Sequence, residues 1–472
     1  MLNMAVIIKT FITPGGCSIF DRDVNSILNV KEEEFPAFQR VEAGTASDDD
    51  WRLLERYTSQ GYLQETRLQE ILHPATPLMK YHLDGSMAQL DLQMTCQCNL
   101  NCHYCVYSGN YKNQRTHSDK TMSLATIYKS IDFLMAHSRN VVEPVLGFYG
   151  GEPLLEYEKI KAGVDYVRTE YKGRSVRFTI TTNGTLFNDE MLRFLEDNEF
   201  SVSVSLDGPK DLHDINRIYA SNGGGSFDDI MANVRYIREN YPELFEKLLF
   251  LTTVAPGVDY SCVNEFYNAD DILSDSSITS NSVNSYNATE EIIYDDLYRT
   301  TYTFQQMKVL LAALGLYDKK KISRLFVSGL SDVERFQKTL SKRTVVEKSH
   351  PGGPCLPGVM RPFVTTDGNI YACERVNESP SMVIGNIETG FDMEKVEAVL
   401  NVGWLTKEEC MACWAFSHCA LCMAACDGGA TLSREERLKH CDSSKSALME
   451  KIETVCMLLE NGYDFNRLNK EG

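Results

Sequence analysis

Apolar runs alternate with helix-like spacing through the middle of the chain. A short alternating run lies at 90–94, and runs rich in β-branched and aromatic residues follow at 145–149, 176–181, 200–206 and 248–254. Between them, apolar residues recur every three or four positions, which predicts amphipathic helices at 124–134, 157–171, 188–197 and 226–239. Strands that alternate with helices predict parallel βα units that share one sheet.

The end of this pattern is less regular. Ser226 and Asp229 form a capping-box pattern at the start of the helix expected at 226–239. Residues 268–296 are rich in Ser, Asn and Asp, which fits either a sixth strand with long loops or a solvated insertion. We favour the insertion. Helical spacing returns at 303–340.

The N-terminal stretch has a different order of elements. Short β-prone runs at 6–12, 17–20 and 27–30 are separated by turn residues, and two helical stretches follow at 31–42 and 48–60. Strands followed by helices predict a small winged-helix unit over residues 1–72. Two prolines, Pro74 and Pro77, then indicate a linker, which we place at 73–86.

Composition narrows the class of protein. The chain has 472 residues, of which 43% are hydrophobic and 24% charged, so two or three globular domains are expected. A net charge of -19 argues against sequence-independent binding to nucleic acid. The chain shows no apolar run of about 18 residues and no signal-peptide pattern at its start, so we expect a cytoplasmic protein without a membrane partner.

Cysteines carry the first chemical signal. Fifteen cysteines in a chain without an export signal indicate a reducing compartment, where clustered thiols hold metal more often than they form disulfides. Cys98, Cys102 and Cys105 follow the first predicted strand with the spacing CxxxCxxC. Three thiolates can hold a 4Fe-4S cluster and leave one iron open. A zinc site completed by Cys96 or His103 is the alternative.

The CxxxCxxC spacing, with Tyr104 before its last cysteine, resembles the signature of the radical S-adenosylmethionine (radical SAM) superfamily. The resemblance implies that Cys98, Cys102 and Cys105 bind a 4Fe-4S cluster whose open iron binds S-adenosylmethionine. It also implies a fold over residues 87–345: an α/β, partial (β/α)6 TIM-like barrel. Functional groups of such a barrel lie at the C-terminal ends of its strands.

Polar motifs do follow the later predicted strands. By the resemblance, the GGEP motif at 150–153 receives the amino group of the cofactor, and an arginine pairs with its carboxylate in a fork. The residues assigned to cofactor binding in this way are Tyr104, Gly150, Gly151, Glu152, Pro153, Asn183, Ser203, Ser205, Asp207 and Arg217.

Within residues 346–472, the eight cysteines from Cys355 to Cys441 form a pattern that resembles the SPASM extension of radical SAM enzymes, which binds two auxiliary 4Fe-4S clusters. Asp367-Gly368 predicts a hairpin turn before the second of these cysteines. The resemblance assigns Cys410, Cys413, Cys419 and Cys441 to the second auxiliary cluster, and Cys355 and Cys373 to the first.

The family pattern has a cysteine where this chain has Met423. Cys422, Cys426 or both therefore complete the first cluster, and if only one does so, an iron stays open. A zinc ribbon with two four-thiolate sites is the alternative.

The N-terminal layout resembles the RiPP recognition element, which binds the leader of ribosomally made peptides as an added strand. The resemblances together imply a maturase that abstracts a hydrogen from a precursor peptide and forms Cys thioether crosslinks, as sactipeptide and ranthipeptide synthases do. Its partners would be the precursor peptide, with the leader on residues 1–72, and an electron donor such as flavodoxin or ferredoxin.

Three alternatives stay open. One is a formylglycine-forming enzyme like the anaerobic sulfatase maturases, which use an Asp beside an auxiliary-cluster cysteine as base. Glu374 stands at that place here and is the candidate catalytic base. The second is an enzyme that forms carbon-carbon crosslinks in peptides, and the third is a peptide-binding metalloprotein without activity.

Overall fold

The protein is seen here as a computed structural model that describes residues 6–274, 276–341, 344–352 and 355–466. Residues 1–5 of the expected N-terminal unit lie outside the described residues. The main body is a ten-stranded sheet with the order β10-β9-β8-β7-β6-β5-β12-β13-β14-β15. Its parallel part consists of β5 (Gln89–Thr95), β6 (Val145–Gly150), β7 (Arg177–Thr182), β8 (Ser201–Ser205), β9 (Leu248–Val254) and β10 (Ser277–Ser282).

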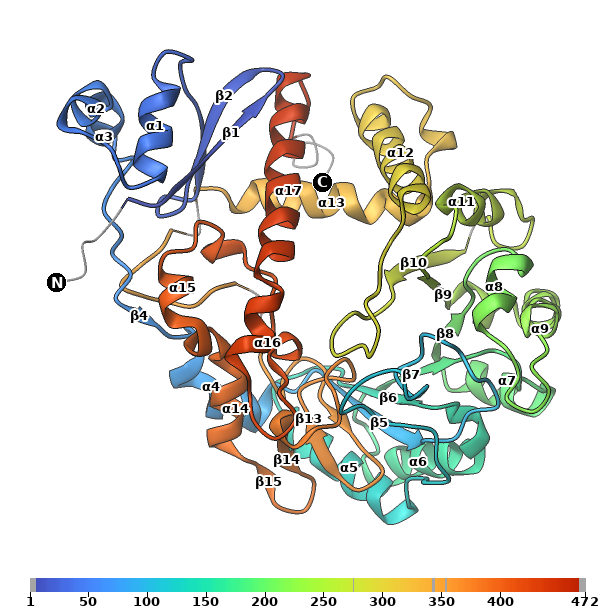
Figure 1. Ribbon diagram of the computed structural model, residues 1–472. Helices are drawn as coiled ribbons and strands as arrows, with labels where there is room; N and C mark the ends of the chain where they lie inside the picture. Colours follow the sequence, from blue (N-terminus) through green and yellow to red (C-terminus); the bar gives the residue numbers. More distant parts are fainter. Residues whose placement is uncertain (1–5, 275, 342–343, 353–354, 467–472) are drawn as a thin grey trace.

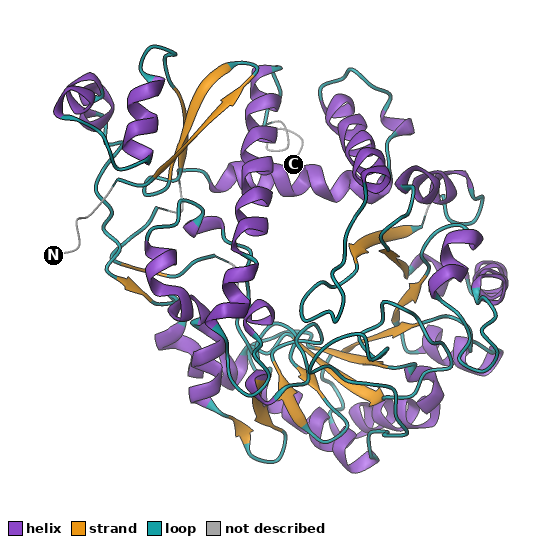
Figure 2. Ribbon diagram, in the orientation of Figure 1, coloured by secondary structure: helices purple, strands orange, loops and turns teal. Residues whose placement is uncertain are grey.

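These six strands form an arc with helices on its outer side (Figure 1; Figure 2). Alternate residues of β8 show why: Val202 and Val204 are buried in the core under the helices, whereas Ser203 and Ser205 are half-buried on the other face. The expected α/β fold of parallel strands covered by helices is confirmed. The helices of this part are α5 (Leu124–His137), α6 (Tyr157–Glu170), α7 (Asp189–Asp197), α8 (Lys210–Asn216), α9 (Phe227–Asn240), α10 (Pro242–Glu246) and α11 (Tyr260–Ala269).

The stretch 268–296 is not only an insertion. Strand β10 lies within it and pairs in parallel with β9 from Ser277 to Ser282. Our preference for a solvated insertion is therefore wrong. Strand β10 is an edge strand whose side chains are mostly polar and exposed, and it is held by backbone hydrogen bonds. The sequence therefore shows no alternation of apolar and polar residues there.

The predicted capping box at the start of α9 is also wrong. The Ser226 hydroxyl donates to the carbonyl of Arg217 (2.9 Å) and lies 3.0 Å from His213 Nε2. Asp214 instead accepts a hydrogen bond from the backbone N–H of Phe227 (3.0 Å). Hydrogen bonds to another helix have replaced the local cap.

A C-terminal hairpin extends the barrel sheet beyond β5. Strand β12 (Phe363–Val364) pairs in parallel with β5 and antiparallel with β13 (Asn369–Tyr371). The turn predicted at Asp367-Gly368 is confirmed, and Gly368 has the positive φ of +80° that favours glycine. Strands β14 (Val383–Asn386) and β15 (Gly390–Phe391) complete the sheet.

The N-terminal unit has the predicted order of strands before helices. Its antiparallel sheet contains β1 (Ile8–Thr13), β2 (Gly16–Asp21) and β3 (Ser26–Asn29), and its helices are α1 (Phe35–Glu42), α2 (Asp48–Leu53) and α3 (Glu55–Ser59). Ile19, Phe38 and Leu54 are fully buried between sheet and helices. Helix α1 begins later than expected because Pro36 fits only in a first helical turn.

The linker predicted at 73–86 is helical in its second half. Helix α4 (Met79–Gly85) buries Met79 and Leu83 in the core of the barrel. The prediction of a linker is wrong there, since the two prolines mark only the turn before the helix. The prolines in a sequence do not show which neighbouring residues are buried in the folded protein.

The N-terminal unit packs against residues 346–472, which we call the cysteine-rich segment. The fully buried Arg22 donates to the carbonyl of Met411 (2.6 Å), and Trp404 Nε1 donates to the carbonyl of Ile71. Strand β4 (Glu70–Ile71) pairs with β11 (Lys348–Ser349). Helix α17 (Cys441–Glu460) runs beside β1 (Figure 1), and α12 (Asp296–Ala313), α13 (Arg324–Thr339) and α14 (Met393–Leu400) complete the C-terminal half. In the described part of the chain, no helix combines the length and apolarity needed to cross a membrane.

Candidate active site

The CxxxCxxC motif lies in the loop that follows β5, residues 96–109, which we call the Cys98 loop. The backbone N–H of Leu100 points at Cys98 Sγ and that of Tyr107 at Cys105 Sγ, each at 3.4 Å. Leu100 and Cys102 are buried, so the packing of these two side chains holds the Cys98 loop in place. The local fold thus turns backbone donors toward two of the three sulfurs.

The three thiols are close enough to affect one another. Burial raises the pKa of Cys98 to about 12, and the charges of Glu152, Cys102 and Cys105 add to the shift. Among the described residues, no group of three His, Cys, Asp or Glu side chains is gathered tightly enough for a single metal ion. In a 4Fe-4S cubane held by three thiolates, each thiolate binds a different iron.

The GGEP motif brings the end of β6 against the Cys98 loop. The N–H groups of Gly151 and Glu152 donate to the carbonyls of Thr95 and Gln97, each at 2.8 Å. A Cβ on Gly151 would lie 2.0 Å from the carbonyl oxygen of Gln97. Gly150 has a φ of +131°, which also favours glycine. Only glycines allow this approach.

Glu152 itself is fully buried. Its carboxylate accepts hydrogen bonds from the Thr182 hydroxyl (2.8 Å), the Asn183 N–H (2.7 Å) and the Leu154 N–H (3.0 Å). Burial raises its pKa to about 7. The carboxylate thus ties the ends of β6 and β7 together.

Asp207 and Arg217 form an ion pair beside the Cys98 loop. Arg217 Nε donates to Asp207 Oδ2 (2.9 Å), and the Tyr104 hydroxyl donates to the same oxygen. The guanidinium lies over the Tyr104 ring, 5.5 Å from its centroid. Burial raises the pKa of Cys102 to about 12, and the positive charge of Arg217 opposes that shift. Arg217 is therefore close to the thiols, with one edge already paired.

Asn183 completes this side of the site. Its Nδ2 donates to Asn99 Oδ1 (2.7 Å) and lies 3.8 Å from Cys98 Sγ. Ser203 and Ser205 are half-buried on β8, the strand next to β7. The ends of β5 to β8 thus hold the sequence-predicted residues of the loop and motifs around one region, as the fold of a barrel requires.

The C-terminal cysteines form two further groups. A cavity of about 210 Å³ lies between α15 (Lys407–Met411), α16 (Arg434–Lys439) and the start of α17. Four of its lining residues are Cys410, Cys413, Cys419 and Cys441. The structure therefore brings together the four cysteines that the sequence pattern assigns to one cluster.

A second group joins cysteines that are distant in sequence. Burial raises the pKa of Cys373 to about 12, and the charge of Cys422 adds to it. Burial also raises the pKa of Cys422, and here the charge of Cys355 contributes. Cys355, Cys373 and Cys422 are thus neighbours. Cys426 is fully buried, and its thiol donates to the carbonyl of Cys422 (3.6 Å).

Glu374, the candidate base, is paired with a cation. Its Oε1 accepts from Arg361 Nη2, while its Oε2 is buried without a hydrogen-bond partner. Arg361 Nε also lies 3.8 Å from Asp91 Oδ2. Burial raises the pKa of Asp91 to about 7, and the charge of Glu374 adds to the shift. Glu374 and Asp91 therefore flank one guanidinium.

Asp91 is a polar residue that sequence reasoning missed. It lies inside the apolar run at 90–94, and its side chain covers Gly147 on β6, where an added Cβ would fall 1.9 Å from Asp91 Oδ1. A carboxylate in the middle of a buried strand was the available signal.

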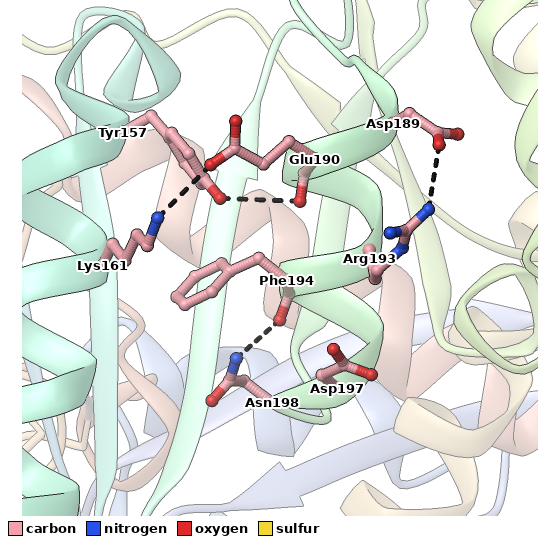
Figure 3. Close-up of a pocket in the computed structure, with 8 residues that line it drawn as sticks. All are labelled: Tyr157, Lys161, Asp189, Glu190, Arg193, Phe194, Asp197 and Asn198. Atoms are coloured by element: carbon pink, nitrogen blue, oxygen red, sulfur yellow. Dashed lines mark hydrogen bonds and ion pairs between the residues drawn. The ribbon is translucent and has the colours of Figure 1, made fainter.

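A larger cavity of about 400 Å³ lies on the outside of the barrel between α6 and α7 (Figure 3). Exposed ion pairs line it, such as Lys161 with Glu190 (3.3 Å) and Arg193 with Asp189 (3.1 Å). None of the residues that the sequence assigns to the cofactor or to the clusters lines this cavity. It is a surface groove apart from the chemistry.

Comparison with known proteins decides the nature of the Cys98 loop. Residues 92–269 match the model of the radical SAM superfamily. This chain contains a radical SAM domain. The matched residues begin within β5 and end after β9, and they include every residue that the sequence assigns to cofactor binding.

Relatives share this region above all. The chain is 33% identical over 184 residues to the uncharacterized protein MJ0907 of Methanocaldococcus jannaschii, covering 39% of this chain and 58% of that protein. It is 32% identical over 162 residues to the cysteine-type anaerobic sulfatase-maturating enzyme of Clostridium novyi, covering 32% of this chain and 40% of that enzyme. The matches thus span about half the length of these relatives.

Two likenesses extend further along the chain. The radical SAM cyclopropyl synthase TigE of Paramaledivibacter caminithermalis is 19% identical over 436 residues, which are 87% of this chain and 85% of that protein. The solved structure described as "Native anSMEcpe with bound AdoMet" has a TM-score of 0.55 at 21% identity, and covers 77% of this chain and 98% of that one. The latter likeness shows a shared fold.

Proposed function

We propose that this radical SAM enzyme is a peptide maturase that forms thioether crosslinks from the cysteines of a ribosomal precursor peptide. One observation carries the proposal: besides the Cys98 loop, the chain gathers two more groups of cysteines in its C-terminal part. Oxidation of a peptide needs an acceptor for an electron, and further clusters supply one. Relatives named as sulfatase-maturating enzymes and a cyclopropyl synthase support a peptide or protein substrate.

The residues of the Cys98 loop fit the cofactor pair of the family. Cys98, Cys102 and Cys105 would hold a 4Fe-4S cluster, which together with bound S-adenosylmethionine would supply a carbon-centred radical for hydrogen abstraction. The protein positions the cluster and the cofactor. Gly151 allows the Cys98 loop to lie close to the end of β6, and Arg217 supplies positive charge beside the thiols.

Cys355, Cys373 and Cys422 would hold the first auxiliary cluster, which would bind the thiolate of a substrate cysteine. Forming the thioether removes one hydrogen atom from carbon, one proton from the thiol and one electron. Glu374 is the candidate base for the proton, and an auxiliary cluster would be the acceptor for the electron.

The N-terminal sheet offers one free edge to a leader peptide. On β1, the N–H of Thr10 already donates to the Glu42 carboxylate (2.8 Å). Strand β3 is the other edge of the sheet, and the pairing of Val30 N–H with Cys17 leaves the N–H of Asn29 directed away from β2. We therefore place the leader on β3 as a fourth strand, bound through its backbone.

Carbon-carbon bond formation is the second candidate. The similarity to a cyclopropyl synthase over 87% of this chain favours it. Both reactions remove two hydrogens from the peptide, but only thioether formation consumes a thiol. Alkylation of the product with iodoacetamide separates them: a crosslinked peptide that has lost no free thiol supports the carbon-carbon bond.

Reconstitution tests the cluster assignment and the radical reaction together. Anaerobic loading with iron and sulfide should give about twelve irons per chain if three 4Fe-4S clusters form, with a flavodoxin, a ferredoxin or dithionite as reductant. The C98A variant should keep roughly eight irons and make no deoxyadenosine. Deoxyadenosine formation that survives in C98A would contradict the assignment, whereas C262A, at an exposed cysteine, should behave as the wild type.

A further inference from the structure

A buried arginine lies between the two groups of C-terminal cysteines. Arg437 on α16 is 1% exposed. Its Nε donates to the Thr406 hydroxyl (3.1 Å), and its Nη1 donates to the Leu421 carbonyl (3.3 Å) and to Cys426 Sγ (3.6 Å). Its Nη2 is buried and has no hydrogen-bond partner. One of its donors is thus left for something else.

The charge of this guanidinium is not matched by a carboxylate. Across the described residues, no Asp or Glu lies within ion-pair distance of Arg437. An unpaired buried charge costs several kcal/mol, so buried cations in proteins are normally compensated. The titratable groups that interact with the charge of Arg437 are thiols, those of Cys426, Cys419 and Cys410.

Arg437 also lines the cavity that holds Cys410, Cys413, Cys419 and Cys441. Thr406 connects it to the same set, because the Thr406 hydroxyl lies 3.2 Å from Cys410 Sγ. The arginine therefore reaches the cavity directly and through one hydroxyl. A cubane held by four thiolates carries net negative charge, which is the missing counter-charge.

We propose that Arg437 is the positioning residue of the second auxiliary cluster: it donates a hydrogen bond to a cluster sulfur through Nη2 and raises the reduction potential of the cluster. This rests on the proposed function, since it presupposes a cluster in this cavity. Reduction adds negative charge, so a fixed cation stabilises the reduced form. Hydrogen bonds to sulfur and net charge are established determinants of such potentials. Arg437 therefore makes this cluster a better electron acceptor than the same cluster would be without the arginine.

The test is a redox titration followed by electron paramagnetic resonance. Full-length protein in the C98A/C102A/C105A background is loaded with iron and sulfide, so that only the auxiliary signals remain. Wild-type Arg437, R437M and R437K are compared. R434M is the matched control, because it removes one positive charge from the same helix at a half-exposed side chain paired with Glu409.

In R437M we expect the ratio of reduced to oxidised cluster at a fixed potential to fall at least tenfold. For a one-electron couple, this corresponds to a fall in the reduction potential of about 59 mV. R437K should recover part of it, and R434M should shift little. A full iron content in R437M with a potential no lower than that of R434M would overturn the proposal.

Loss of iron also decides between outcomes. If R437M loses roughly four irons and R437K keeps them, the charge is needed to hold the cluster, which supports the proposal. If R437K loses them as well, the charge has no such role and the proposal fails. An auxiliary signal absent with Arg437 in place would instead refute the cluster assignment itself, and the two failures are thereby distinguished.

Discussion

At the end of β6, Gly150 and Gly151 set how closely the Cys98 loop lies against the sheet. The motif was found from the sequence, but its reason was not. Sequence resemblance assigns GGEP to the cofactor's amino group, whereas the structure shows Glu152 buried and tied to β7. Gly151 is required by the carbonyl of Gln97 and Gly150 by the carbonyl of Thr95, and no local pattern encodes these two contacts.

Replacing Gly151 should therefore disturb the first cluster. In G151A the new Cβ would meet the Gln97 carbonyl at 2.0 Å, so the Cys98 loop must move. We expect a loss of roughly four irons per chain after reconstitution and no deoxyadenosine. G329A is the control, because Gly329 on α13 has no atom within 4 Å of its Cβ position. Full iron content in G151A would contradict this account of the motif.

Asp91 gives a prediction for stability against pH. Its pKa is raised from 3.8 to about 7 by burial and by Glu374, so the folded state holds the proton more tightly than the unfolded state does. Its contribution to stability is thus present below about pH 4 and is lost as pH rises to about 7, on the order of 4 kcal/mol.

D91N should flatten this dependence, because the amide does not ionise. The melting temperature of the wild type, measured by scanning fluorimetry, should fall more between pH 5 and pH 7.5 than that of D91N. D132N, on the exposed face of α5, serves as the control and should follow the wild type. Equal slopes for wild type and D91N would rule out the buried ionisation.

Among the elements, the parallel strands and their helices were predictable because burial on one face leaves a clear hydrophobic period. Two elements were not. Strand β10 is an exposed edge with polar side chains. Helix α4 is buried against the barrel core, and the proline-rich segment before it gives no indication of this burial. Both depend on tertiary neighbours. The edge strand β3 could be placed from the sequence, but which edge of its sheet is free depends on Glu42.

The free edge of β3 predicts how a leader peptide binds. N29P removes the backbone N–H that points away from β2, so affinity for a fluorescein-labelled synthetic leader should fall at least tenfold, about 1.4 kcal/mol. N29A loses the same side chain and keeps the N–H, so it should bind as the wild type does. Fluorescence anisotropy measures both. Equal affinities for N29P and N29A would place the leader elsewhere.

Over the whole molecule, the sequence suggests an N-terminal unit separate from the rest, but the structure packs that unit on the cysteine-rich segment. Arg22 reaches the carbonyl of Met411, between Cys410 and Cys413, and lies over the Phe416 ring. Contacts between units so distant in sequence leave no periodic signal. Point variants such as N29P therefore test the leader site more cleanly than a deletion of 1–72 would.

The most direct test of the central claim is the mass of a peptide made together with this enzyme. The chain is co-expressed anaerobically with each small cysteine-containing peptide encoded beside its gene, and the purified peptide is weighed by mass spectrometry. The account predicts that one of them loses two hydrogen atoms and one free thiol per link, and that C98A leaves it unchanged. Deoxyadenosine formation with every such peptide unaltered would contradict the claim that this enzyme matures peptides.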